Sequence, residues 1–210
     1  ARLYWKKGGN AMIIDISSYN GKIDWATVAA EANVNRIIHR GTTKNGTLDG
    51  RLIENVKGIA KAYFNKPYPT LDVYKFSYAR SYDAAVVEAY NLIKMLRIKG
   101  VSNIFYALWL DLEDFDGRSH TTAECAAVIA AYESVCAQFE IKFGIYCNYN
   151  YVRNILPKWA ANDHIWLAKW SDNIGDLGEF KSNTVLWQYT TKGKVPGIPN
   201  ATDLSREVNI

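Results

Sequence analysis

Short apolar runs along the chain alternate with stretches in which apolar residues recur every three or four positions. Runs rich in β-branched and aromatic residues predict β-strands, whereas the longer periodic stretches predict helices. The predicted strands cover residues 12–17, 36–42, 72–78, 104–113, 142–148, 164–170 and 184–190, and a short extended piece follows near Asp203. The predicted helices cover residues 25–32, 52–63, 82–98, 122–139 and 151–161.

Residues at the ends of these helices fit the chemistry of helix termini. Asp24 is placed to cap the first helix, and Thr121 with Glu124 forms a capping box at the start of the fourth. Gly100 follows the third helix, where a glycine suits the left-handed conformation of a C-terminal cap. These caps support the helix boundaries.

Repeated strand–helix alternation predicts parallel strands joined by crossover helices. Seven or eight strands favour a small, irregular (β/α) TIM-like barrel that forms a single domain, and the last units look too short to hold full helices. An open doubly wound sheet is the alternative. A nucleotide-binding version of that sheet has little support, because the segment after the first strand reads DISSYNG and lacks a glycine-rich phosphate loop.

Composition sets limits on partners. The chain has 210 residues, 49% of them hydrophobic and 22% charged, which suits one globular domain with a sizeable core. The net charge of +4 is compatible with an anionic bacterial wall but too small and scattered to indicate nucleic-acid binding. No apolar run approaches the roughly 20 residues that span a membrane, so no membrane association is expected.

Residues 1–11 lack the apolar stretch of a signal peptide. We interpret them as an extension joined to a natural start at Met12, with residues 12–210 as the folded domain; a short natural extension is the alternative.

The three cysteines do not predict a disulfide framework. Cys125 and Cys136 lie eleven residues apart on one predicted helix, a separation of about 16 Å at 1.5 Å per residue. A disulfide needs Cα atoms within about 7 Å. The three histidines are isolated, and His39 is interpreted as a core or site-lining residue, so neither a metal nor a cofactor is expected.

Four acids fall at the predicted carboxyl ends of strands, where the active sites of α/β barrels lie: Asp15, Asp111, Glu113 and Asp203. Side chains two positions apart on a strand project to the same side, so Asp111 and Glu113 would share the barrel mouth. Their Cα atoms would be about 6.6 Å apart. Two carboxylates this close raise the pKa of one of them, so that one stays protonated while the other is ionised. Glycoside cleavage requires both forms: a proton for the leaving oxygen and a negative charge beside the reacting carbon.

A solvated strand end is the alternative reading of Asp111 and Glu113, and by themselves the two acids would favour it. Asp15 and Asp203 change the balance, because a barrel brings their strand ends to the same mouth. In contrast, Glu88, Glu124 and Glu133 are interpreted as solvent-facing helix residues.

Aromatic residues gather near the same strand ends. Flat aromatic faces stack on sugar rings, and tyrosine hydroxyls can bond N-acetyl groups. For about half of these residues, ordinary core packing is the better explanation. They are Tyr74, Phe76, Tyr78, Tyr146, Trp166, Trp170, Trp187 and Tyr189.

Taken in order, these motifs resemble glycoside hydrolase family 25, the Chalaropsis-type lysozymes common among bacterial and phage lysins, from Met12 to Val208. No single piece is specific, but their order and spacing are. The matching segments are Ile14-Asp-Ile-Ser-Ser-Tyr-Asn-Gly21, Ile23-Asp-Trp25, Arg40 with Asp49, Leu52 and Asn55, Val73-Tyr-Lys-Phe-Ser-Tyr78, Leu110-Asp-Leu-Glu113, Gly144-Ile-Tyr-Cys-Asn148, Trp166-Leu-Ala168, Leu186-Trp-Gln-Tyr189 and Asp203. Two positions depart from the family: Asp72, where glycine is frequent, and Ser205, where asparagine is frequent.

The resemblance implies hydrolysis of the β-1,4 bond between N-acetylmuramic acid and N-acetylglucosamine in the peptidoglycan of bacterial cell walls. It implies that Glu113 is the general acid, that Asp111 orients the substrate's acetamido group, and that Asp15 and Asp203 hold this pair. The expected substrate contacts are Tyr74, Tyr78, Tyr146, Arg40, Trp170, Trp187 and Gln188. A C-terminal wall-binding module, frequent in the family, would lie beyond this chain.

Two alternatives remain. A chitinase-like enzyme of family 18 also ends a strand in D-x-E, but its pattern needs two further acids at positions occupied here by Tyr106 and Trp109. A non-catalytic glycan-binding relative would keep the aromatic residues and tolerate loss of acids, whereas all four acids are present.

Overall fold

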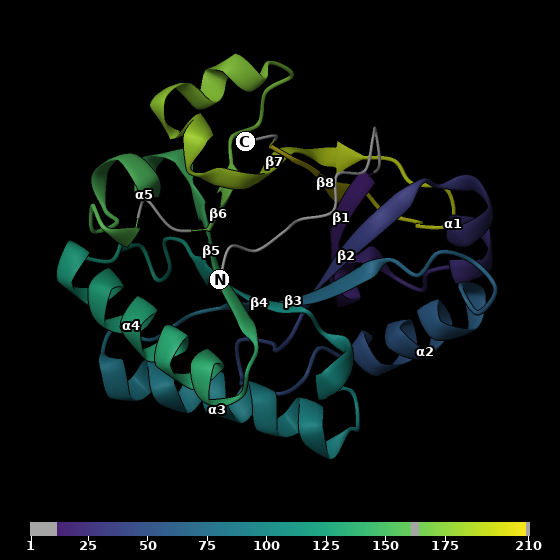
Figure 1. Ribbon diagram of the computed structural model, residues 1–210, viewed down its shortest axis with the longest axis horizontal. Coiled ribbons are helices and arrows are strands. Elements are labelled where there is room, and N and C mark those ends of the chain that lie inside the picture. The colour runs from purple at the N-terminus through teal and green to yellow at the C-terminus, as the bar shows by residue number, and fades with distance from the viewer. Residues whose placement is uncertain (1–11, 161–163, 209–210) are drawn as a thin grey trace.

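The computed structural model describes residues 12–160 and 164–208, so the interpretation of residues 1–11 lies outside the described residues. Eight strands form a closed barrel in which each strand pairs with the next along the chain (Figure 1). This confirms the predicted barrel and excludes the open sheet. The strands are β1 (Met12–Ile16), β2 (Val34–Arg40), β3 (Thr70–Phe76), β4 (Ala107–Leu112), β5 (Lys142–Asn148), β6 (Ile165–Ala168), β7 (Thr184–Gly193) and β8 (Thr202–Glu207).

Helices pack outside the barrel, and Figure 1 shows α2, α3 and α4 covering the side that contains β2 to β5. The predicted caps are present: the Asp24 side chain accepts from the first turn of α1, and Thr121 with Glu124 forms the capping box of α4. The α-helices are α1 (Trp25–Glu31), α2 (Leu52–Ala62), α3 (Tyr82–Ile98), α4 (Thr122–Gln138) and α5 (Tyr149–Asn154). Short 3-10 helices are η1 (Ser18–Asn20), η2 (Ser102–Ile104) and η4 (Ile174–Ser182).

The last third of the chain departs from the expected pattern. β8 runs antiparallel to both β7 and β1, because residues 194–201 are too few for the crossover that a parallel strand needs. The helix expected over residues 151–161 ends at Asn154 instead. Pro157 follows shortly, and its ring disfavours the helical conformation in the residue before it. Ala161 lies outside the described residues.

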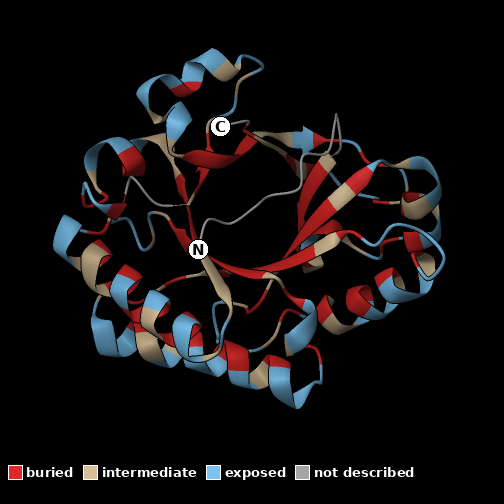
Figure 2. Ribbon diagram, viewed as in Figure 1, coloured by how far each residue is buried: buried red, intermediate tan, exposed pale blue. Residues whose placement is uncertain are grey.

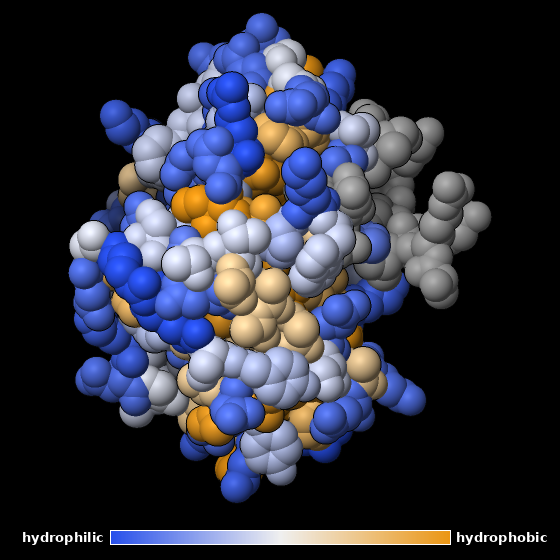
Figure 3. Space-filling model, turned by 90° about the vertical axis from the view of Figure 1, so that its left-hand side faces the viewer, coloured by the Kyte–Doolittle hydropathy of each residue, from blue (hydrophilic) through white to orange (hydrophobic). Residues whose placement is uncertain are grey.

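The strand that carries the central acids alternates between two cores. Leu108, Leu110 and Leu112 face the helices, whereas Ala107 and Trp109 pack inside the barrel. The strands are buried on both faces, as the red ribbons of Figure 2 show, while the helices are exposed on their outer sides. Figure 3 shows one outer face of the molecule, where hydrophilic residues surround small hydrophobic areas.

A tryptophan layer fills the barrel below its mouth. The rings of Trp109 and Trp166 meet edge to face with centroids 5.7 Å apart. Gly144 makes room for Trp109, since an added Cβ would lie 2.4 Å from the ring atom Cζ3. The Trp109 Nε1–H donates to Asp72 Oδ2 at 2.9 Å, so the residue two positions before Asp111 is fixed by both packing and a buried hydrogen bond.

Among the described residues, no helix is long and apolar enough to cross a membrane. All three cysteines are buried and free. The helix spacing predicted that Cys125 and Cys136 are not bonded to each other.

Candidate active site

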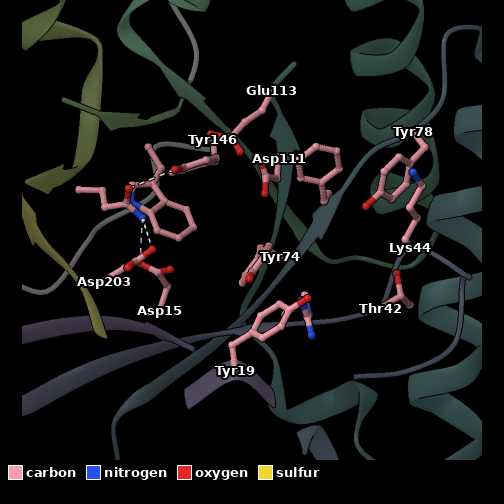
Figure 4. Close-up of a pocket in the computed structure, with 14 residues that line it drawn as sticks. Asp15, Tyr19, Thr42, Lys44, Tyr74, Tyr78, Asp111, Glu113, Tyr146 and Asp203 are labelled. Carbon is pink, nitrogen blue, oxygen red and sulfur yellow. Dashed lines mark hydrogen bonds between the residues drawn. The ribbon is translucent and has the colours of Figure 1, made fainter. Parts of the chain in front are cut away.

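A cleft of about 250 Å³ opens at the carboxyl ends of the strands (Figure 4). It combines carboxylates, tyrosines and two basic side chains, and its lining residues come from all eight strands and from the loops after β1 to β4. Its lining consists of Asp15, Tyr19, Arg40, Thr42, Lys44, Tyr74, Phe76, Tyr78, Asp111, Glu113, Tyr146, Trp166, Gln188 and Asp203.

Asp111, on β4, lies deeper in the cleft than Glu113. The alternation of the strand directs it into the barrel, where its side chain is buried and its Oδ1 has no hydrogen-bond partner among the described residues. Burial raises the pKa of Asp111 well above the usual range, and the charges of Glu113 and Asp15 raise it further. Lys75, behind the strand wall, lowers this pKa. A buried oxygen without a partner suits a polar group of a bound ligand.

Glu113 follows the last residue of β4, is half-buried and lines the cleft. Burial raises its pKa, and the charges of Asp114 and Asp203 add to this effect. A carboxyl group in this setting keeps its proton to a higher pH than a free glutamate does.

Asp15 and Asp203 complete the acidic cluster from the neighbouring strands β1 and β8, where they are direct partners in the antiparallel register. Burial raises the pKa of Asp15 well above normal, followed by the charge of Asp203. Burial also raises the pKa of Asp203, whereas the hydrogen bond between the two carboxyl groups lowers it. The hydrogen bond between the two carboxyl groups thus favours the proton on Asp15 and the negative charge on Asp203.

Gln188 links the pair to the rest of the wall. Its Nε2 donates to Asp15 Oδ2 at 3.1 Å and to Asp203 Oδ2 at 3.4 Å. Its Oε1 accepts from the Tyr146 hydroxyl at 3.1 Å and from Trp170 Nε1 at 3.3 Å. An indole nitrogen can only donate, so this network fixes the orientation of the amide.

Three tyrosines expected to contact substrate, Tyr74, Tyr78 and Tyr146, line the cleft. Tyr146 packs against Trp166 with ring centroids 4.6 Å apart, and Tyr78 packs against Phe76 at 4.8 Å. These contacts hold the rings rigidly and leave their remaining surfaces for a ligand.

Arg40 also lines the cleft, but its guanidinium is engaged by the protein. Nε donates to Asp49 Oδ2 at 2.8 Å, and a terminal nitrogen donates to Ser18 Oγ at 2.8 Å. The guanidinium also lies over the Tyr19 ring, 4.8 Å from its centroid. Arg40 therefore supports the loop after β1 and contributes only part of its surface to the cleft.

The expectation that Trp187 contacts substrate at the barrel mouth is wrong. Its side chain is fully buried on the outer face of β7, where Nε1 donates to Lys169 O at 2.6 Å. Trp170 is 67% exposed and does not line the cleft, which it touches only through Gln188.

Sequence reasoning missed several residues near the site. Tyr19, Thr42 and Lys44 line the cleft from the loops after β1 and β2. The sequence could have indicated these residues only by their position, because they are among the first side chains past the strand ends. Figure 4 shows Thr42, Lys44 and Tyr78 on the opposite side of the cleft from Asp15 and Asp203.

Glu88 is not solvent-facing, contrary to expectation. Its Oε2 accepts from Ser77 Oγ at 2.7 Å and from the Tyr132 hydroxyl at 3.1 Å, and its Oε1 accepts from the Tyr78 backbone N–H at 3.0 Å. The buried Lys75 ammonium lies 3.8 Å from Oε1. Glu88 therefore holds the segment after β3 that carries Tyr78.

Glu124 is likewise engaged, by the α4 cap and by Arg80 and Arg118, while Glu133 is exposed as expected. Among residues 12–160 and 164–208, no group of three or more His, Cys, Asp or Glu side chains is arranged to hold a metal ion.

Comparison with solved structures shows a shared fold. The modular autolysin LytC from Streptococcus pneumoniae, solved in complex with a synthetic peptidoglycan ligand, matches 93% of this chain with a TM-score of 0.80 and 23% identity. The chain spans about half of LytC, 46% of its length. The catalytic domain of endolysin ply40 from bacteriophage P40 of Listeria monocytogenes matches with a TM-score of 0.70 and 22% identity, covering 94% of each chain.

The bacterial lysozyme from Streptomyces coelicolor matches 97% of this chain, which covers 94% of that enzyme, with a TM-score of 0.73 and 17% identity. A search of curated proteins found no match. A sequence model of the family described as glycosyl hydrolases family 25 matches residues 14–198. That match spans most of the barrel, from the strand of Asp15 to the loop before Asp203, and the chain belongs to glycosyl hydrolases family 25.

Proposed function

We propose that the protein is an N-acetylmuramidase that cleaves the β-1,4 bond between N-acetylmuramic acid and N-acetylglucosamine in bacterial cell walls. Family membership supports glycoside hydrolysis. The observation that carries the proposal is the convergence of four carboxyl groups with raised pKa values on one tyrosine-lined cleft. Such a cluster supplies both a proton and negative charge at the same bond.

Glu113 is the proposed general acid. It lines the cleft and is half-buried, and its raised pKa keeps a proton available for the leaving glycosidic oxygen. The bond from that oxygen to the anomeric carbon breaks as the proton arrives.

Asp111 is proposed to orient the substrate's acetamido group, whose N–H would meet the unpartnered Oδ1. The raised pKa of Asp111 describes the unliganded site. An N–H donor and the positive charge that develops in the reaction both favour its ionised form, so substrate lowers this pKa. The acetamido oxygen can then act on the anomeric carbon, a recognised variant of two-carboxylate hydrolysis.

Tyr74, Tyr78 and Tyr146 are proposed to contact the sugars and their acetamido groups. All three line the cleft beside the acids. Trp170 is proposed to offer its exposed ring to a sugar at the rim.

Residues 12–210 are proposed to act as the catalytic part of a longer lysin that reaches the bacterial wall and binds it through a separate module. The support is the coverage of only 46% of LytC, which is described as modular.

Mass spectrometry of digested, purified walls tests the proposed reaction. The expected products carry a muramic acid at the new reducing end. A glucosamine reducing end, free stem peptides, or release of reducing sugar from chitin but not from walls would each contradict the proposal.

A further inference from the structure

The hydrogen-bonding capacity of Gln188 is fully used within the protein. A glutamine amide has two N–H donors and two acceptor lone pairs. Here the donors serve Asp15 and Asp203, and the lone pairs serve Tyr146 and Trp170. The side chain is also only 2% exposed. A substrate could bond Gln188 only by displacing one of these partners.

Two of these partners present an electrostatic problem that Gln188 is placed to solve. Asp15 and Asp203 lie directly opposite each other in the β1–β8 ladder, where like charges destabilise a sheet. An amide that donates to both keeps the carboxyl groups side by side and stabilises the negative charge that they share. Of the other ionisable groups that face the pair, Asp111 and Glu113 come from β4 and the residue after it, Tyr74 from β3, Tyr146 from β5 and Arg40 from β2.

The same charge acts on the proposed general acid, because the Asp203 carboxylate raises the pKa of Glu113. We propose that Gln188 is a positioning residue for the reaction: its amide holds the singly charged Asp15–Asp203 pair in place, and through Asp203 it keeps Glu113 protonated. This inference rests on the proposed function and replaces the expected substrate contact by Gln188.

The Gln188→Met variant tests this role, because methionine has a similar length but cannot donate to either carboxyl group. Without the N–H donors, the ionised form of the pair is less stable, so Asp15 and Asp203 hold their protons to higher pH. Less negative charge then faces Glu113, and its pKa falls. The alkaline limb of the pH–rate profile should move to lower pH, and kcat should fall about ten- to a hundredfold with a smaller change in KM.

Thr184→Val is a matched control on the same strand. It removes a partly buried hydrogen bond from Thr184 Oγ1 to Phe180 O at 2.7 Å, outside the cleft lining. It should lower the melting temperature without moving the pH profile. If the Gln188→Met profile overlays that of the wild type, or if KM rises while kcat is unchanged, Gln188 is a structural residue or a substrate contact and the inference is wrong.

Gln188→Glu serves as a second variant of unchanged shape. It keeps an acceptor for Trp170 and replaces the lost N–H donors by a carboxyl group, whose negative charge beside Glu113 offsets the protons gained by Asp15 and Asp203, so the alkaline limb should lie at higher pH than in Gln188→Met. An alkaline limb that falls as far as in Gln188→Met would overturn the inference.

Carbon-13 NMR titration of the Glu113 carboxyl in the unliganded protein separates this inference from the proposed function. We expect a lower Glu113 pKa in Gln188→Met than in the wild type, whether or not the protein cleaves walls. An unchanged Glu113 pKa contradicts the positioning role, whereas an inactive wild type contradicts only the proposed muramidase activity.

Discussion

Asp15 and Asp203 meet across the antiparallel ladder between β1 and β8, the first and last strands of the barrel. Because β8 is antiparallel, its amino end lies at the same end of the barrel as the active site. Asp203 therefore stands near the start of β8, whereas Asp15 stands near the end of β1. The reversal of the last strand thus brings an acid from the end of the chain beside one from its beginning. A barrel of eight parallel strands would place a residue so early in the last strand at the opposite end.

Glu113→Gln should lower the rate of wall hydrolysis by about a hundred- to ten-thousandfold, because an amide cannot give a proton to the leaving oxygen. The fold should survive, since the side chain is only half-buried. Release of reducing ends from purified walls measures the rate. Glu54→Gln, on the exposed side of α2 and paired only with Arg51, is the control and should retain wild-type activity. Substantial activity in Glu113→Gln would remove Glu113 as the acid.

Glu88→Ala should destabilise the protein by at least about 2 kcal/mol, because the buried hydroxyls of Ser77 and Tyr132 lose their acceptor. KM should also rise, since the Tyr78 backbone is released. Chemical denaturation and steady-state kinetics measure the two effects. Glu133→Ala, also on a helix but exposed, should change neither, and equal behaviour of the two variants would contradict the role of Glu88.

The barrel and three of its four acids were predictable because they rest on local patterns. The expectation that Asp203 lies at the carboxyl end of its strand is wrong: it lies near the amino end of β8, and the antiparallel direction of that strand brings it to the same mouth. Apolar strands, capped helices and the strand-end positions of Asp15, Asp111 and Glu113 follow from residues close in sequence. The parallel architecture then brings those ends together without further information.

The orientation of Trp187 and Gln188 was not predictable in the same way. Residues 184–188 are all buried, because this strand packs against the barrel interior on one face and the outer layer on the other. Such a strand lacks the polar–apolar alternation that shows which side chains face inward. Glu88 was missed for another reason, since its partners Ser77 and Tyr132 come from β3's end and from α4, and only the folded chain brings them together.

Gly144→Ala should cost about 1–3 kcal/mol, the usual effect of overpacking a core, because the added Cβ would lie 2.4 Å from a ring atom of Trp109. Activity should fall as well, since Trp109 supports the strand that carries Asp111. Thermal melting and wall hydrolysis measure both. In Gly50→Ala the added Cβ meets open space, so this variant should be neutral. If Gly144→Ala proves as stable and active as Gly50→Ala, Trp109 moves aside readily and the prediction is wrong.

Asp111→Asn should abolish activity yet stabilise the fold at neutral pH. The pKa of Asp111 is raised by burial first and by Glu113 and Asp15 next, so ionising it is less favourable in the folded than in the unfolded protein. A raised folded pKa means that stability is fully present below the unfolded value of about 3.9 and is lost as pH rises toward the folded value. Asparagine does not ionise, so the variant keeps this stability as pH rises.

The melting temperatures of wild type and Asp111→Asn should therefore diverge as pH rises from acid to neutral, with the variant higher. They should approach each other again in acid, where the wild-type carboxyl is protonated. Asp83→Asn, an exposed residue in the first turn of α3, controls for the loss of one carboxylate and should not be stabilised at neutral pH. A constant difference at every pH would mean that packing, and not the buried charge, separates Asp111 from asparagine.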